Sequence, residues 1–371
     1  MVKSMYAAVA GLRAHQAKMD VIGNNIANVN TFGFKKARAT FRDQFYATMR
    51  GSSEADMVYG GGNPSQVGYG SSLSSIEVDF GTASGAPTGN GMDVMIDGNG
   101  FFLVGKYFEN GLSNTSFDAS VANLTQLNLT RIGIFNIDGQ GWLVDSLRNH
   151  VYGFAQGYDD GTGTVTNKLV TTDGNALLEP LQVPWCYYDA NGKVMTDPDS
   201  GKAIQVVWST DNEGQYTVDS TINQQDNPTE AGPSGRVADG TNAPTDAVYI
   251  APMKLSSISI GDSGDIVGIN QDTEEVITLG KILIADVPNP NALEDTSNGY
   301  YRVKKNTGIV TAEEPGHGST GSLSAGRLEM ANVDLAQEFT DMITTQRGFQ
   351  ANGRIITVTD QMLEELVNLK R

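Results

Sequence analysis

In this 371-residue sequence, catalysis could be supported by the histidines, by residues with a side-chain hydroxyl group or by clusters of acidic residues. His15, His150 and His317 lie in separate segments, and none is followed three or four positions later by another metal-ligating residue, as a helical zinc motif would require. The residues around Ser319 lack the Gly-x-Ser-x-Gly spacing of a nucleophile elbow. The sequence therefore predicts no catalytic centre.

Two further motifs suggest ligand sites at first sight. Residues Gly261–Glu275 are acidic and glycine-rich, but they miss the Asp-x-Asp-x-Asp-Gly register of a calcium loop, which favours a β-turn. Thr88–Gly91 does not precede a helix, so we do not expect it to hold a phosphate. We predict no metal and no cofactor.

Cys186 is the single cysteine, which excludes an intrachain disulfide and a multi-cysteine metal site. We expect it to be a small buried apolar residue, and a reactive or cross-linking thiol is the alternative.

The net charge of −18 argues against nucleic acid as the main partner. No run of 18 apolar residues is present, so no membrane insertion is predicted. Met5–Leu12 resembles a signal-peptide core, but its helical pattern continues past Arg13, so if the chain is exported we expect no signal to be cleaved. Residues 1–50 hold eight basic and two acidic residues, a net of +6. This basic segment either meets an acidic surface of its own kind or is a solvated helix.

Both ends of the chain carry apolar residues at helical spacing. These repeats would place an apolar surface along each terminal helix. The N-terminal stripe consists of Met5, Val9, Leu12, Met19, Ile22 and Ile26. The C-terminal stripe repeats every seven residues, at Leu328, Leu335, Met342, Phe349, Ile356 and Leu363, with Phe339 beside it. The other edge of this stripe is polar, at Gln346, Gly353 and Asp360. A lone helix of about 40 residues cannot bury such a stripe, so we expect the two helices to pair.

Between the helices the pattern is that of β-strands. Ala83–Gly105 alternates around an Asp-Gly-Asn-Gly turn, which is typical of a hairpin, and Leu129–Gly157 contains an Asp-Gly turn of the same kind. Strands are also predicted at Leu255–Ile260, Asp265–Ile269, Glu275–Ala285 and Tyr300–Val303. The predicted fold is mainly β with terminal α-helices and two β-rich domains, the outer one inserted in the inner one. Its predicted parts are a helical core (1–30 and 327–371), an extended linker (31–75), an inner β domain (76–157 and 253–326) and an outer β domain (158–252).

Two long motifs resemble those of the flagellar rod–hook family of bacterial axial proteins. In Ser4–Lys36 the matching residues are Asn24, Asn25, Ala27, Asn28, Asn30, Thr31, Gly33, Phe34 and Lys35. Near the C-terminus they are Asn332, Val333, Asp334, Glu338, Met342, Gln346, Arg347, Ala351, Asn352 and Asp360, whereas Ala331 stands where the family often has Ser. The motifs cover about a fifth of the chain, and Ile96–Phe102 and Thr130–Asp145 extend the likeness.

The resemblance implies a structural subunit rather than an enzyme, located in the extracellular flagellum, which polymerises helically into a hollow tube. The large insertion favours the curved hook, a universal joint between rod and filament, and a distal rod protein is the alternative. The implied partners are further copies of the chain, the rod protein, the hook cap protein, the hook–filament junction protein and the flagellar export apparatus. The implied assembly residues are, in the two helical stripes, Met5, Val9, Leu12, Met19, Ile22, Ile26, Leu335, Phe339, Met342, Phe349, Ile356 and Leu363, and, in the family motifs and linker, Asn24, Asn25, Asn28, Asn30, Phe32, Gly33, Phe34, Lys35, Asn332 and Arg347.

The asparagine run ends the first predicted helix, because Asn competes for backbone hydrogen bonds and favours caps and turns. After it we interpret Phe32 and Phe34 as anchors, and Lys35, Lys36 and Arg38 as contacts for acidic neighbouring subunits. The alternative is that these residues only cover their own β domain. A different class of function, a secreted β-rich glycan-binding protein or hydrolase, would require clustered carboxylates or exposed aromatics in a groove.

Overall fold

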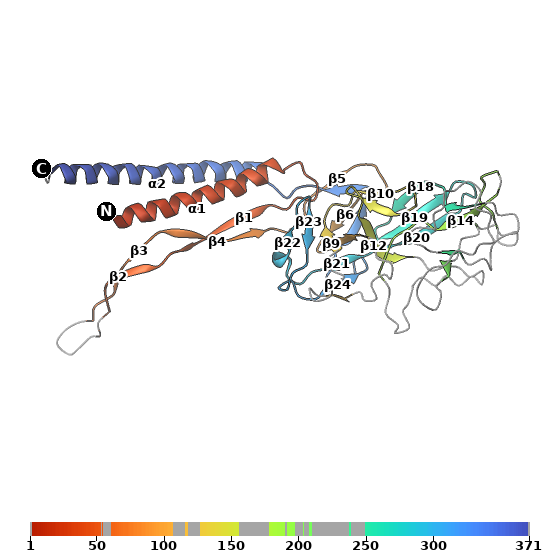
Figure 1. Cartoon of the computed structure of the whole chain (residues 1–371), viewed down its shortest axis with the longest axis horizontal. Helices are drawn as coiled ribbons and strands as arrows, with labels where there is room; N and C mark the ends of the chain where they lie inside the picture. Colours follow the sequence, from red (N-terminus) through yellow and green to blue (C-terminus); the bar gives the residue numbers. More distant parts are fainter. Residues whose placement is uncertain are drawn as a thin grey trace. The chain divides into compact units, whose positions relative to one another are not determined.

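The computed structural model describes residues 2–52, 54, 61–106, 116–117, 127–155, 178–189, 191–196, 203, 208–209, 237–238 and 249–369. The chain divides into two compact units (Figure 1). The first unit comprises Met1–Gly81 and Ala331–Arg371, and the second comprises Thr82–Met330. The chain thus leaves the first unit once and returns to it once.

The first unit contains two long helices and a β-ribbon. Its elements are α1 (Val2–Ala27), β1 (Ala37–Asp43), β2 (Tyr46–Arg50), β3 (Ser65–Gly68), β4 (Ser71–Val78) and α2 (Leu335–Leu369). The predicted terminal helices are confirmed. One member of the predicted C-terminal repeat is misplaced, because Leu328 lies in a short strand and is buried there.

The described part of residues 31–75, which we expected to form an extended linker, contains strands that pair as antiparallel ribbons. β1 pairs with β4 from Ala37↔Val78 onward, and β2 pairs with β3. The alternation of polar and apolar residues in this segment is weak, so no local pattern indicated that its strands would pair.

The ends of the helices follow local hydrogen-bonding rules. Asp334 caps α2, because its carboxylate accepts the backbone N–H groups of Ala336 and Gln337 at 2.9 and 3.3 Å. After α1, Gly33 adopts a φ of 69°, a left-handed conformation that suits glycine, and the chain reverses there.

The second unit is built from short antiparallel strands, as the sequence predicts. Its elements are β5 (Gly85–Pro87), β6 (Val94–Asp97), β7 (Phe101–Gly105), β8 (Ser116–Phe117), β9 (Leu127–Thr130), β10 (Phe135–Ile137), β11 (Leu143–Asp145), β12 (His150–Ala155), β13 (Glu179–Pro180), β14 (Trp185–Tyr188), β15 (Trp208–Ser209), β16 (Val237–Ala238), β17 (Tyr249–Pro252), β18 (Leu255–Ile260), β19 (Asp265–Asn270), β20 (Val276–Ile282), β21 (Ile284–Asp286), a 3₁₀ turn η4 (Pro290–Ala292), β22 (Glu294–Asp295), β23 (Tyr300–Arg302), β24 (Val310–Glu313), β25 (Ser322–Ala325) and β26 (Arg327–Glu329).

The strand pairing shows how the second unit is closed. A large sheet contains the path β18-β19-β20-β12-β7-β21-β24-β8. Outside it, β5 pairs with β26 and β6 pairs with β25, so the first strands of the unit lie beside its last strands. The segments that enter and leave this unit are therefore joined by backbone hydrogen bonds.

One predicted hairpin is wrong. The strands on either side of the Asp-Gly-Asn-Gly turn, β6 and β7, do not pair with each other, because β6 pairs with β25 whereas β7 pairs with β9, β12 and β21. Gly98 and Gly100 adopt φ values of 125° and 117°, and a Cβ on Gly100 would lie 2.1 Å from a side-chain carbon of Ile284. These glycines allow the backbone to lie close to β21, and they do not form the turn of a two-stranded hairpin. The Asp138–Gly139 turn does join the paired strands β10 and β11.

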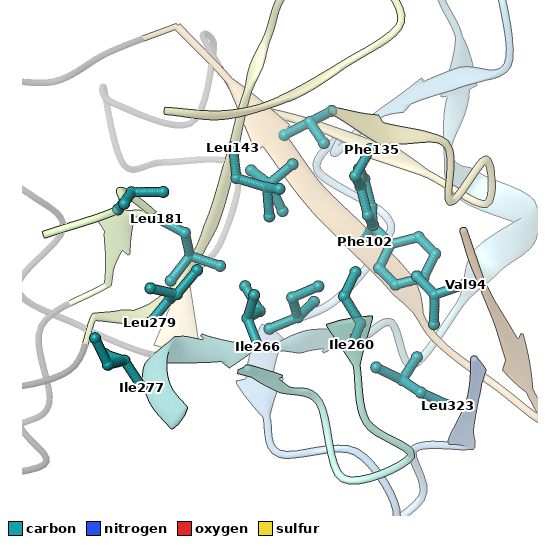
Figure 2. Packing of buried hydrophobic residues seen from close by; sticks show 14 of the residues in the cluster. Val94, Phe102, Phe135, Leu143, Leu181, Ile260, Ile266, Ile277, Leu279 and Leu323 are labelled. Atoms are coloured by element: carbon teal, nitrogen blue, oxygen red, sulfur yellow. The ribbon is translucent and has the colours of Figure 1, made fainter. Parts of the chain in front are cut away.

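The hydrophobic core of the second unit draws on strands far apart in the sequence. Figure 2 shows Phe102 beside Phe135, whose ring centroids lie 5.2 Å apart, with Leu181 and Ile266 in the same cluster. Leu181 and Cys186 come from the segment expected to form the outer domain. Most of that segment lies outside the described residues, so a separate outer domain stays a prediction.

Two polar clusters are enclosed in this unit. Arg131 and Glu329, with side chains 1% and 0% exposed, form an ion pair at 3.5 Å. Arg131 also donates to the carbonyl oxygen of Gly98 at 2.9 Å. In the other cluster the Tyr300 hydroxyl donates to the Asp145 carboxylate at 2.6 Å, and burial followed by this hydrogen bond raises the pKa of Tyr300.

Candidate assembly surface

The two helices of the first unit contact each other through small and polar residues. A Cβ on Gly11 would lie 2.6 Å from the Asn352 side-chain nitrogen, and a Cβ on Gly348 would lie 2.7 Å from the His15 ring. The two glycines thus allow the backbones to come close where Asn352 and His15 fill the contact. Lys18 forms an ion pair with Asp341 at 3.4 Å in the same interface.

The predicted stripes are only partly covered by this pairing. On α1, Ile22 is buried, and Met5, Val9, Leu12, Met19 and Ile26 are half-buried. On α2, Met342, Ile356 and Leu363 are half-buried, whereas Leu335, Phe339 and Phe349 are 39%, 50% and 38% exposed. The contact within the chain therefore leaves part of the C-terminal stripe open.

Polar residues occupy the buried positions of α2 instead. Glu338, Thr345 and Thr359 are buried, at intervals of seven and fourteen residues. The Thr345 and Thr359 hydroxyls donate to the carbonyl oxygens of Asp341 and Ile355, each at 2.6 Å, so they are satisfied without a partner on α1. No hydrophobic pattern in the sequence marks this edge, because threonine is neither clearly apolar nor charged.

Ten large apolar side chains of α2 remain more than a third exposed to solvent: Leu335, Phe339, Ile343, Phe349, Ile355, Val358, Met362, Leu366, Val367 and Leu369. At about 100° per residue, Leu335, Phe339 and Ile343 share one face near the start of the helix, and Ile355, Val358, Met362, Leu366 and Leu369 share another face near its end. Monomeric soluble proteins rarely expose contiguous apolar patches, and such patches mark interaction sites. We therefore expect α2 to contact a further partner in addition to α1.

The asparagine motif organises the turn after α1. The Asn25 side chain is buried and pairs with both backbone groups of Ala37, at 2.9 and 3.0 Å. Asn28 donates to the backbone and side-chain oxygens of Asn24, and Asn30 is exposed. Asn24, Asn25 and Asn28 thus hold the chain reversal through contacts within the chain.

A second asparagine links the two family motifs. The Asn332 side chain accepts the backbone N–H of Lys36 at 2.7 Å and donates to the carbonyl oxygen of Asp79 at 2.7 Å. It therefore ties the segment before α2 to both sides of the β1–β4 ribbon. The predicted residue Arg347 is exposed on α2.

The basic residues after the turn have partners within the chain. Lys35 is buried and donates to the carbonyl oxygen of Gly81 at 2.8 Å. Lys36 pairs with Asp79 at 3.6 Å, and Arg38 pairs with Glu77 at 3.2 Å. These contacts favour the interpretation that the three basic residues contact their own chain rather than a neighbouring subunit. An intersubunit role for this segment therefore rests on Phe32, which is 37% exposed, and on the half-buried Phe34.

Little in the described chain supports a ligand site of another class. Within those residues no three His, Cys, Asp or Glu side chains gather where they could hold a metal ion, and no helix is long and apolar enough to cross a membrane. Trp142 and Trp185 are buried, so they do not line an exposed sugar-binding groove. Cys186 is buried as predicted, and burial raises the pKa of its thiol to about 12.

Comparison with known proteins matches these same regions. The family model of the flagella basal body rod protein matches residues 5–35, and that of the flagellar basal body rod FlgEFG protein C-terminal region matches residues 324–369. The flagellar basal-body rod protein FlgG of Bacillus subtilis is 34% identical, with all of both chains covered. The chain belongs to the flagellar rod and hook protein family.

Hook proteins are also among its relatives. The flagellar hook protein FlgE of Borreliella burgdorferi is 30% identical with all of both chains covered, and FlgE of Escherichia coli is 29% identical over 98% of this chain and 99% of its own. The crystal structure of Helicobacter pylori flagellar hook protein FlgE2 matches 66% of this chain at 11% identity and a TM-score of 0.36, too low to support an argument. The family consists of structural components of the flagellar axis that associate with copies of themselves.

Proposed function

We infer that this chain is a structural subunit of the bacterial flagellar hook, which polymerises helically into a hollow curved tube. The tube would act as a universal joint that transmits torque from the rod to the filament. The observation that carries this inference is the exposed apolar surface of α2, together with full-length similarity to hook proteins.

The energetics favour assembly through this surface. Ten large apolar side chains of α2 are between 38% and 82% exposed. Fully burying one such side chain contributes about 1.5–3 kcal/mol, so covering the remaining exposed area would contribute on the order of 10 kcal/mol per subunit. Association costs roughly 4–15 kcal/mol in lost freedom, so the two terms are of comparable size.

The net charges of the two units differ, which supports a different role for each unit in assembly. The first unit holds 12 basic and 12 acidic residues, so the whole net charge of −18 belongs to the second unit. Second units would repel one another, whereas neutral first units can associate. We therefore place the main polymer contacts in the first unit and expect assembly to be favoured by salt.

The remaining partners follow from this role. We propose export to the cell exterior through the flagellar export apparatus without cleavage, assembly beneath a hook cap protein, and end contacts with the rod and the hook–filament junction protein. The role is mechanical rather than catalytic. A distal rod protein is the second candidate, supported by the 34% identity with FlgG of Bacillus subtilis.

Polymerisation of the purified chain tests the inference. Ile355→Ser, Val358→Ser and Met362→Ser together should abolish salt-induced polymers in a sedimentation assay, because they remove apolar surface that the monomer does not use. The matched control carries Gln350→Ser, Thr357→Ser and Asp360→Ser on exposed polar positions of the same helix and should polymerise normally. If the apolar triple variant polymerises like the unmodified chain, α2 is not the assembly surface.

A further inference from the structure

A groove of about 660 Å³ opens between α1 and the β-ribbon of the first unit. Val9, Ala10 and Leu73 contribute apolar surface to it, and Phe45 and Tyr69 form an aromatic pair on the ribbon side with ring centroids 5.3 Å apart. Phe45 is 72% exposed although it is large and apolar. This volume falls in the range of about 300–1,000 Å³ that is typical of pockets that accept a ligand.

Arg13 is the charged residue among those that line the groove, and the Lys3 ammonium lies 5.8 Å from the centre of the Tyr69 ring. The Arg13 side chain forms no ion pair with another residue in the described part of the chain. An apolar groove with an unpaired guanidinium suits an amphipathic helix that carries a carboxylate beside its apolar stripe.

The distal end of α2 has these properties. Gly11 lies against Asn352 and His15 against Gly348, so the helices run antiparallel and Val2 falls opposite Gln361. The last eight residues of α2 extend about 12 Å beyond that point, at 1.5 Å per residue, and Figure 1 shows α2 continuing past the start of α1.

The overhanging end carries its own apolar stripe. Met362, Leu366 and Leu369 are 42%, 48% and 82% exposed and recur at helical spacing. Glu365 lies three residues after Met362 and four before Leu369, so it falls on the same face, whereas Glu364 has no such spacing to any of them. Both glutamates are exposed.

We propose that the distal end of α2 from a second copy of this chain docks in the groove between α1 and the β-ribbon. Met362, Leu366 and Leu369 cover Val9, Ala10 and the aromatic pair, and Glu365 pairs with Arg13. Helical assembly as inferred above is the premise of this contact. The occupant comes from another copy because the distal end of α2 runs along and beyond α1, without a proline at which it could fold back around α1.

The contact is head-to-tail, because each copy offers the end of α2 and receives another at its groove. Such heterologous contacts leave a free donor and a free acceptor at the ends of every chain of copies, and they build open filaments when the rotation does not close. One groove and one helix end on each copy therefore suffice for continuous growth of a single strand of copies.

Charge reversal tests the proposed pair in polymers of the full chain. Arg13→Glu and Glu365→Lys should each raise the critical concentration for salt-induced polymerisation roughly tenfold, because each turns an attraction into a repulsion. The two substitutions together should restore it to within about threefold of the unmodified chain. The matched control combines Arg13→Glu with Glu364→Lys, and its critical concentration should stay as high as that of Arg13→Glu alone. Circular dichroism of each monomer checks that the exposed substitutions leave the fold intact.

Cross-linking gives an independent readout of the same contact. Copies carrying Ser72→Cys at the groove are mixed with copies carrying Leu366→Cys, and a short bis-maleimide should join the two copies during polymerisation. Thr357→Cys, exposed elsewhere on α2, replaces Leu366→Cys in the control and should give at most a tenth of that yield.

The outcomes separate this contact from the broader function. Polymers that form normally, without rescue by Glu365→Lys and without a specific cross-link, would overturn the groove contact and leave the assembly function standing. Equal rescue by Glu364→Lys would also overturn it, because the effect would then be one of net charge. A chain that forms no polymers would overturn both.

Discussion

Replacing Arg131 with methionine should strongly destabilise the second unit. Arg131 follows β9, and its ion-pair partner Glu329 ends β26, the last strand before the chain leaves the unit. The other Glu329 oxygen accepts the backbone N–H of Ala83 at 3.1 Å, where the chain enters. This pair thus joins the core of the second unit to the segments where the chain enters and leaves it.

The magnitude follows from the burial of both partners. Side chains 1% and 0% exposed have lost almost all contact with water, so removing the cation leaves a buried carboxylate without its counter-ion. Breaking a buried pair in this way costs about 3–5 kcal/mol, whereas replacing both partners by uncharged residues of similar shape is often close to neutral. We therefore expect Arg131→Met to lower the unfolding free energy by about 4 kcal/mol, and Arg131→Met with Glu329→Gln to recover at least half of that loss.

Thermal unfolding followed by circular dichroism measures this loss. For a unit of this size a change of 1 kcal/mol shifts Tm by about 2–4 °C, so Arg131→Met should lower Tm by about 8–16 °C. Lys304→Met is the control, because Lys304 and Glu294 form an ion pair that is 50% and 53% exposed, and its loss should cost less than about 1 kcal/mol. Equal effects of Arg131→Met and Lys304→Met, or no recovery in the double variant, would refute the argument from burial.

Three further predictions concern single groups. Asn25→Ala leaves both backbone groups of Ala37 without their partner, so urea unfolding should show a loss of about 1–3 kcal/mol, whereas the exposed control Asn30→Ala should change little. Cys186 should react with a maleimide at pH 8 about a thousandfold more slowly in the folded chain than in urea, because burial raises its pKa from 9.0 to about 12; equal rates would contradict this. Because the pKa of Tyr300 is raised in the folded chain, the protonated hydroxyl contributes its full stabilisation below pH 10, and this contribution falls as the pH rises further. Tyr300→Phe should therefore make the decrease of unfolding free energy with pH shallower above pH 10. An unchanged slope of unfolding free energy against pH would rule this out.

The terminal helices and most strands were predictable because their signals are local. Heptad spacing identified both helices, and β18 begins and ends where the sequence predicts. The predicted hairpin failed because a glycine-rich turn specifies a sharp reversal but not which strands then pair. Gly100 faces Ile284, which lies far away in the sequence.

The assembly surface was only partly predictable, for a related reason. The apolar stripe of α2 was visible, but the face that meets α1 is set by Gly11, His15, Gly348 and Asn352, which no hydrophobic pattern marks. The same holds for Lys35, whose basic character suggested a contact with another subunit while its actual partner is a backbone carbonyl of the same chain. Long-range packing, rather than residue type, decided these positions.

Electron microscopy of detached flagella from cells that carry this chain tests the central claim most directly. The chain should be labelled by an antibody against its second unit, and a hook subunit should carry the label along short curved tubes with a central channel, between rod and filament. Label confined to straight tubes would contradict the hook assignment in favour of the distal rod. Intact flagella without label on any tubular segment would contradict assembly altogether.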